Sequence, residues 1–228
     1  MHPMLNIAFQ ASRKASKHML RSFDQLERVT ISEKTDNDFV TDVDTFVEKL
    51  IIEHIKEAYP DHSILAEESG LIEGNEYCWI IDPLDGTHNY IHGIPHFAIS
   101  IAVKKNEELL VGLIYDPIRN ELFTATKGAG AELNHRRMRV SSTPSLKQAL
   151  IGTGFPFRDQ HHIEPYLKTF GCLLPQTADI RRAGSAALDL AYIASGRLDG
   201  FWEPSLKPWD MAAGALMIKE AGGMLCDF

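Results

Sequence analysis

Two N-terminal stretches of the chain carry apolar residues at helical spacing. Residues 4–20 mix apolar and basic positions, and residues 42–58 show the pattern more clearly. The apolar residues of the second stretch form one stripe, made by Val43, Phe46, Val47, Leu50, Ile51, Ile55 and Ala58. Thr41 or Asp42 precedes this stripe as a helix cap, and Pro60 follows its end. The spacing therefore predicts two amphipathic helices.

Short apolar runs with β-like composition fill the middle of the chain. There are five of them, at 64–66, 77–81, 97–103, 109–115 and 122–126. The second run ends at Asp82-Pro83. The breaks contain Lys-Lys-Asn, Asp-Pro and Lys-Gly-Ala-Gly, which are turn-forming combinations. Because the runs are spaced as in hairpins, they predict a mostly antiparallel sheet.

The pattern changes after about residue 145. Two strand-like and two helix-like segments follow, at 146–153, 184–195, 198–202 and 209–221. Gly196 and Gly222-Gly223 end the two helix-like segments. No linker separates the two regions. We therefore predict one layered α/β domain over residues 1–228, with a first lobe at 1–145 and a second at 146–228.

Composition and charge exclude several classes of protein. The 228 residues are 44% hydrophobic and 24% charged, which is typical of a folded domain and not of a disordered chain. Aspartate and glutamate outnumber lysine and arginine by 31 to 23, so the net charge is −8. An acidic chain is a poor general binder of nucleic acid or of anionic membranes. A phosphate substrate would therefore need positive charge from another source.

Cysteine usage and the apolar stretches point to the cytoplasm. Cys78, Cys172 and Cys226 are odd in number and far apart, which is typical of reduced thiols. The longest stretch without Asp, Glu, Lys or Arg is 86–103, and its histidines, asparagine and proline are incompatible with a membrane helix. Residues 1–20 lack the apolar core of a signal peptide.

Two aspartates stand three residues apart in a proline turn after the apolar run at 77–81. Pro83 fixes the backbone φ between Asp82 and Asp85, and Gly86 permits close approach to a ligand. Thr87 opens a short helix-like stretch whose first amides can bind phosphate. Solvated turn residues are one interpretation. A hard cation, Mg²⁺ or Mn²⁺, held between the two carboxylates is the other.

Three further acidic positions have ordinary interpretations when each is taken singly. Glu67 and Glu68 follow a predicted strand and suit a solvated loop. Asp210 begins an apolar helix and suits a cap. Asp44 lies in the first turn of the helix predicted at 42–58, where a negative charge favours the helix dipole. The residues by themselves leave both interpretations open.

Taken together, four segments resemble the inositol monophosphatase family, particularly its bacterial SuhB-type members. They are DFVTDVD at 38–44, LAEES at 65–69, DPLDGTHNY at 82–90 and PWDMAAG at 208–214. Their order matches the family's order, and the resemblance covers nearly the whole chain. It implies a fold of alternating α-β-α-β-α layers with metal ions between the two lobes.

The resemblance also implies a metal site with two to three Mg²⁺ ions, for which Mn²⁺ can substitute and which Li⁺ inhibits. The implied ligands are Glu67, Asp82, the carbonyl of Leu84, Asp85 and Asp210. Asp82 would bridge two ions, Glu67 would serve the first and a third, and Asp85 and Asp210 would hold the second. Three divalent ions would balance the four carboxylates and a phosphate dianion, so metals explain how an acidic protein recruits an anion.

Catalytic and substrate roles follow from the same resemblance. Asp44 and Thr87 would orient and deprotonate a metal-bound water that attacks phosphorus in line, assisted by Glu67, without a covalent intermediate. Glu203 lies seven residues before Asp210, as the family's inositol-contacting glutamate does. The implied substrate contacts are Glu67, Leu84, Asp85, Gly86, Thr87, Gly184, Ser185, Ala186, Glu203 and Asp210.

The resemblance leads to three hypotheses about function. The first is Mg²⁺-dependent hydrolysis of inositol 1-phosphate by a cytoplasmic homodimer. The second is a related lithium-sensitive phosphatase that acts on histidinol phosphate, a 3′-phosphoadenosine nucleotide or fructose bisphosphate. The third is a non-enzymatic role as a partner in transcription antitermination and ribosomal RNA processing, without direct nucleic-acid binding.

The family pattern also bears on the C-terminal region. Family members continue past the equivalent of Phe228 with further strands and a helix. The resemblance therefore implies an uncovered sheet edge and uncovered apolar helix faces in this chain. We expect low thermal stability or a partner that covers this face, and a high melting temperature of a strict monomer would contradict that expectation.

Overall fold

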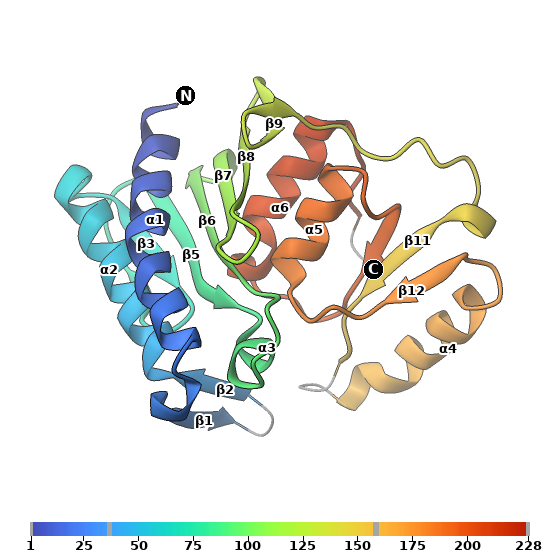
Figure 1. The fold of residues 1–228 in the computed structure, drawn as a ribbon. Helices are drawn as coiled ribbons and strands as arrows, with labels where there is room; N and C mark the ends of the chain where they lie inside the picture. The colour runs from blue at the N-terminus through green and yellow to red at the C-terminus, as the bar shows by residue number, and fades with distance from the viewer. Residues whose placement is uncertain (1, 36–37, 157–159, 227–228) are drawn as a thin grey trace.

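The protein folds into alternating layers of helices and sheets. The computed structural model describes residues 2–35, 38–156 and 160–226. Across those residues the strands form an eight-stranded, a three-stranded and a two-stranded sheet. From left to right, Figure 1 shows a helical layer, the large sheet, a second helical layer, the small sheet and a further helix. This arrangement confirms the predicted layered α/β fold.

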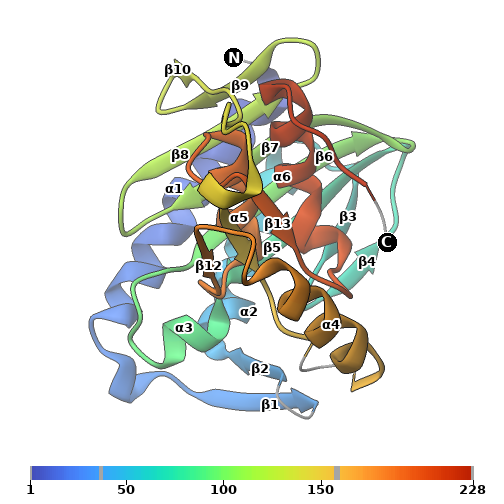
Figure 2. The same cartoon turned by 90° about the vertical axis from the view of Figure 1, so that its right-hand side faces the viewer.

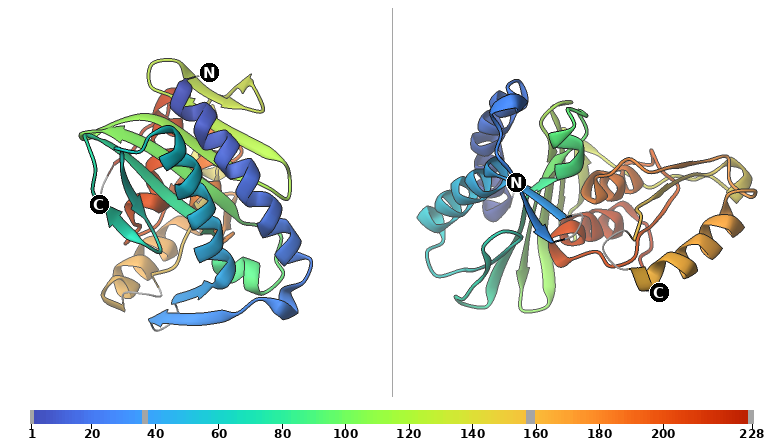
Figure 3. Two further views of the ribbon diagram at one scale, coloured as in Figure 1. Left: turned by 90° about the vertical axis from the view of Figure 1, so that its left-hand side faces the viewer. Right: turned by 90° about the horizontal axis from the view of Figure 1, so that it is seen from below.

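The two predicted N-terminal helices are both present and cover one face of the large sheet. They are α1 (Pro3–Phe23) and α2 (Asp42–Ala58), which lie side by side on that face in Figure 3. Thr41 is the cap of α2, because its side chain accepts from the backbone of Val43 and Asp44. A short 3₁₀ turn (Leu26–Arg28) and a hairpin of β1 (Ile31–Thr35) and β2 (Asp38–Thr41) connect the two helices.

The large sheet has the order β10-β9-β8-β7-β6-β5-β3-β4. Its strands are β3 (Ser63–Ala66), β4 (Gly70–Ile72), β5 (Tyr77–Asp85), β6 (Ala98–Lys105), β7 (Glu108–Asp116), β8 (Glu121–Thr126), β9 (Gly130–Leu133) and β10 (Arg136–Arg137). All neighbours pair antiparallel except β3 and β5, which are parallel. The five predicted strands and the mostly antiparallel character are confirmed, whereas the short strands β4, β9 and β10 were not predicted.

Strand β5 continues beyond its predicted end at Asp82-Pro83. It pairs with β6 as far as Asp85, with Asp82 opposite Ser100 and Asp85 opposite Ala98. Pro83 and Leu84 of β5 therefore stand opposite the single residue Ile99 of β6, which is a β-bulge. Residues three apart point to opposite faces of a regular strand, so the extra residue is what brings Asp82 and Asp85 to one side.

Helices from the C-terminal half cover the other face of the large sheet. After β5 comes the short helix α3 (Thr87–Ile91), and α5 (Ala186–Ala194) and α6 (Pro208–Ala221) form the inner helical layer. One apolar core fills the space between the large sheet and α1 and α2, and a second core lies between the sheet and α5 and α6. The two regions of the chain thus share a buried interface.

A small parallel sheet completes the fold. Its order is β12-β11-β13, with β11 (Leu150–Thr153), β12 (Asp179–Arg181) and β13 (Gly200–Trp202). The strand predicted at 146–153 begins only at Leu150, because Leu146–Gln148 forms a 3₁₀ turn. A turn at Gln160–His162 leads into α4 (Ile163–Leu173), which lies in front of this sheet in Figure 2. Neither β12 nor α4 was predicted.

Two predictions from the sequence, about membrane helices and about cysteines, can be compared with the fold. Within the described residues, no helix combines the length and the apolar character that crossing a bilayer requires. Cys78, Cys172 and Cys226 are all free thiols, as predicted.

Candidate active site

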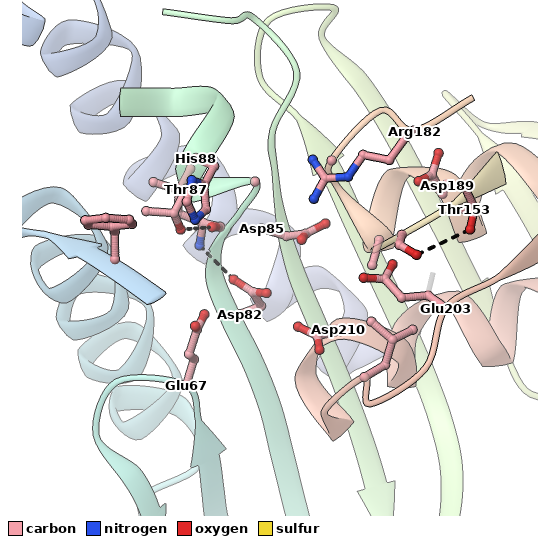
Figure 4. A pocket seen from close by; sticks show the side chains of 17 residues that line it. Glu67, Asp82, Asp85, Thr87, His88, Thr153, Arg182, Asp189, Glu203 and Asp210 are labelled. Carbon is pink, nitrogen blue, oxygen red and sulfur yellow. Dashed lines mark hydrogen bonds between the residues drawn. The ribbon is translucent and has the colours of Figure 1, made fainter. Parts of the chain in front are cut away.

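A pocket lies where the C-terminal end of β5 meets the starts of α3, α5 and α6. Of the predicted site residues, ten line it: Glu67, Asp82, Leu84, Asp85, Gly86, Thr87, Gly184, Ala186, Glu203 and Asp210. The other two, Asp44 and Ser185, lie behind the wall and contact Thr87 and Asp85. Figure 4 shows the carboxylates of Glu67, Asp82, Asp85 and Asp210 arranged along the pocket. Segments far apart in the sequence therefore meet at one place.

Asp82 is one of two acids of the pocket that are almost fully buried, together with Asp189. Its side chain is 2% exposed, and its Oδ1 accepts the backbone N–H of Leu84 at 3.0 Å. Burial raises the pKa of Asp82 well above its ordinary value, and the charges of Glu67, Asp85 and Asp210 raise it further. The four carboxylates are thus close enough to repel one another.

Asp85 joins the end of β5 to the start of α5. Its Oδ2 accepts the Ser185 hydroxyl at 2.5 Å and the Ala187 N–H at 2.7 Å. Desolvation raises the pKa of Asp85 to about 6, although these hydrogen bonds oppose the rise. Ser185 is also the N-cap of α5, so the same hydroxyl caps the start of the helix and holds the carboxylate. The contact ties the large-sheet side of the pocket to the helices of the second half.

Asp44 and Thr87 form a hydrogen-bonded pair behind the acidic cluster. The Thr87 hydroxyl lies 3.2 Å from Asp44 Oδ1 and 3.0 Å from the Leu84 carbonyl, and its single proton serves one of them at a time. Asp44 Oδ2 accepts the backbone N–H and the hydroxyl of Thr41. Burial raises the pKa of Asp44 to about 6 against these hydrogen bonds. The carboxylate is therefore ionised at neutral pH and aimed at Thr87.

The donors of the pocket suit a hard divalent cation. Glu67, Asp82, Asp85 and Asp210 offer only oxygen ligands, which Mg²⁺ and Mn²⁺ prefer. In the part of the chain that the structure describes, no three His, Cys, Asp or Glu side chains already form a complete ion-binding set. Like charges repel, so a cation bound between these carboxylates would stabilise their arrangement. The raised pKa of Asp82 is the observation that fits such an ion.

The second half of the chain supplies the opposite wall. Gly154, Arg182 and Glu203 each follow the C-terminal end of a parallel strand, after β11, β12 and β13. Ligands of open parallel sheets bind at this edge. Asp189 of α5 joins them at 2% exposure, and burial raises its pKa to about 8 while Arg182 opposes the rise. Sequence reasoning did not select Gly154, Arg182 or Asp189. Strand β12, which Arg182 follows, was not predicted, and the predicted strand at 146–153 and helix at 184–195 did not show that Gly154 and Asp189 face the pocket.

Glu48 is another residue that sequence reasoning missed. It is 3% exposed on α2, and its two carboxylate oxygens accept the backbone N–H groups of Glu68 and Ser69 at 2.8 and 2.9 Å. It therefore holds the loop that carries Glu67. A glutamate on the inner face of the helix predicted at 42–58 was the available signal.

Replacing Glu48 with glutamine is expected to loosen this loop. An amide nitrogen cannot accept a hydrogen bond, so one partly buried backbone N–H loses its partner, at a cost of about 1 kcal/mol. We expect the affinity for Mg²⁺ to fall about tenfold, as when other supports of metal ligands are removed. Calorimetric titration with Mg²⁺ measures the effect, and Glu53→Gln, an exposed change on the same helix, is the control. Unchanged Mg²⁺ affinity in Glu48→Gln would contradict the assignment.

Comparison with known proteins agrees with this geometry. The model of the Inositol monophosphatase family matches residues 1–228. The Nus factor SuhB of Pseudomonas aeruginosa is 53% identical over the whole of this chain and 86% of that protein. The crystal structure of the extragenic suppressor protein suhB from Bartonella henselae superposes with a TM-score of 0.94 at 43% identity, over 97% of this chain and 86% of that one. An IMPase of Thermotoga maritima gives a TM-score of 0.90 at 36% identity, over 99% and 86%.

Proposed function

The chain belongs to the inositol monophosphatase family, and from that premise we propose that it hydrolyses inositol 1-phosphate with the help of Mg²⁺. The observation that carries the proposal is the meeting of four carboxylates with the Asp44–Thr87 pair in one pocket. The carboxylates provide an oxygen-only set of ligands, and the pair provides a proton acceptor beside them. The family supports a phosphatase in general, and this pocket supports the finer assignment.

The ligands in this proposal are Glu67, Asp82, Asp85, Asp210 and the Leu84 carbonyl. Bound Mg²⁺ would neutralise the phosphate and acidify the attacking water. Asp44 accepts a hydrogen bond from the Thr87 hydroxyl, which leaves a lone pair of the Thr87 oxygen facing the pocket. That oxygen can take a proton from water while its own proton passes to Asp44. Thr41 keeps Asp44 in place from behind. Burial of Asp82 and Leu84 excludes bulk water from the inner end of the pocket.

The wall opposite the acidic cluster favours a substrate whose alcohol part carries no second phosphate. Arg182, Asp189 and Glu203 line it, and the pKa of about 8 keeps Asp189 mostly protonated at neutral pH, so this wall carries little net charge. A wall with a single cationic side chain does little to neutralise a second phosphate dianion, which disfavours fructose bisphosphate and 3′-phosphoadenosine nucleotides. A neutral polyol suits the wall through hydrogen bonds. Histidinol phosphate, whose alcohol carries an ammonium group, is the second substrate that the same acids favour.

A role in transcription antitermination is a second candidate function. It is supported by the identity of 53% to a protein named Nus factor SuhB. In this proposal the chain acts in the cytoplasm, as a homodimer, and binds its partners through protein surfaces and not through the pocket. Association with the transcription machinery that survives substitution of Asp85 would support it, and loss of association in that variant would contradict it.

Phosphate release from inositol 1-phosphate and from histidinol phosphate tests the enzymatic proposal. We expect turnover that requires Mg²⁺, stops with EDTA and falls when Li⁺ is added, with inositol 1-phosphate preferred. Mn²⁺ should restore part of the activity of EDTA-treated protein. A folded protein whose melting temperature responds to Mg²⁺, and which releases phosphate from neither compound, would contradict the proposal.

A further inference from the structure

The small sheet places Gly154 and Glu203 side by side. Strands β11 and β13 run parallel, with Thr153 opposite Trp202. The Trp202 carbonyl accepts both the Thr153 hydroxyl at 3.0 Å and the Gly154 N–H at 3.4 Å. Gly154 and Glu203, the next residues after these strands, are therefore held at the same level, at the edge of the sheet that faces the pocket.

The Glu203 carboxylate occupies the space that a side chain at position 154 would need. A Cβ on Gly154 would lie 1.8 Å from Cδ of Glu203 and 2.0 and 2.1 Å from its two carboxylate oxygens. Real Cβ atoms essentially never approach within 3.0 Å of another heavy atom. The φ angle of Gly154 is not among the left-handed ones, so the backbone conformation does not itself require glycine. The three atoms nearest to such a Cβ all belong to Glu203.

The neighbours of Gly154 belong to the substrate wall. Strand β11 is the middle strand of the sheet, so Gly154 lies between Arg182, after β12, and Glu203, after β13. The Arg182 guanidinium stacks over the Phe155 ring at 5.2 Å. In Figure 4, Arg182, Asp189 and Glu203 lie on one side of the pocket, and Glu67 and Asp82 lie on the other.

We propose that Gly154 is a positioning residue that sets the specificity of the pocket for the alcohol part of its substrate. Its missing side chain lets Glu203 lie across the end of β11, with the carboxylate facing the pocket, where it accepts hydrogen bonds from hydroxyl groups. The acidic cluster around Asp82 is on the other side and does not depend on Gly154. This inference rests on the proposed phosphatase function and extends it to a residue that touches no substrate atom.

The test compares Gly154→Ala on two substrates. Inositol 1-phosphate offers hydroxyl groups to Glu203, and phenyl phosphate offers none. For inositol 1-phosphate we expect KM to rise about tenfold with kcat little changed, since a hydrogen bond to a charged group is lost. For phenyl phosphate we expect both constants to stay within about twofold of wild type. Gly171→Ala is the matched control, because a Cβ on Gly171 in α4 meets nothing within 4 Å.

A double-mutant cycle with Glu203→Ala separates positioning from general damage. Glu203→Ala should reproduce the rise in KM, and adding Gly154→Ala to it should raise KM no further. Wild-type kinetics of Gly154→Ala on inositol 1-phosphate would overturn the proposal. An equal loss on phenyl phosphate, or a further rise in KM in the Glu203→Ala background, would overturn it too.

Thermal melting tests the contact independently of any activity. We expect Gly154→Ala to lower the melting temperature when Glu203 is present and to leave it unchanged in the Glu203→Ala background, where the colliding atoms are gone. Equal losses in both backgrounds would overturn the positioning contact. If wild-type protein hydrolyses neither phosphate, the phosphatase proposal fails, and the melting data still decide whether Gly154 holds Glu203.

Discussion

Replacing Asp85 with asparagine is expected to abolish phosphate release while the protein stays folded. Asparagine keeps an oxygen that accepts the Ser185 hydroxyl and the Ala187 N–H, so the link between β5 and α5 survives. It removes the negative charge that a divalent cation needs at this position. We expect kcat for inositol 1-phosphate to fall at least about 100-fold, the loss seen when one electrostatic contact to a transition state is removed.

The control for this variant is Asp61→Asn, the same chemical change on an exposed side chain. Circular dichroism and the melting temperature establish that both variants are folded, and phosphate release at saturating Mg²⁺ gives the activity. Near-normal turnover of Asp85→Asn would remove Asp85 from the site and with it the proposed arrangement of ligands.

Replacing Asp82 with asparagine is expected to make the metal-free protein more stable and insensitive to Mg²⁺. The Asp82 carboxylate is buried among three other acids, and asparagine removes its charge while keeping the oxygen that accepts the Leu84 N–H. If removing this buried charge adds ~1.5 kcal/mol to the free energy of unfolding, the melting temperature of a chain of this size rises by about 3–6 °C. Wild-type protein should instead gain ~2.7 kcal/mol from Mg²⁺ at 100 times its Kd, and the variant should gain far less.

The same variant has a defined dependence on pH. The pKa of Asp82 is higher in the folded protein than its ordinary value of 3.8, so the folded state binds this proton more tightly. Its contribution to stability is complete below pH 3.8 and is lost as the pH rises through the folded pKa. Without metal, the stability advantage of Asp82→Asn over wild type should therefore widen with rising pH. Melting in EDTA from pH 5 to pH 8 measures it, and an advantage that shrinks with rising pH would contradict the burial of a charged Asp82.

Local signals predicted most of the fold. The apolar stripe at 42–58 and the turn residues between 64 and 126 depend on nearest neighbours in the sequence, and the structure has helices and strands there. Strand β12 gave no such signal, because it has three residues, none of them buried. Helix α4 was missed for a similar reason, since Tyr166 is its one buried residue in the described chain.

The sequence by itself determined which acids gather at the pocket. The motifs at 65–69, 82–90 and 208–214, which together resemble those of one family, place their acidic residues at the ends of strands and the starts of helices. The tertiary structure alone decided what holds those acids and what faces them. Glu48 reaches a loop twenty residues away, and Glu203 lies over Gly154 because of the register between β11 and β13. Such contacts arise from packing between distant segments, and no local pattern in the chain encodes them.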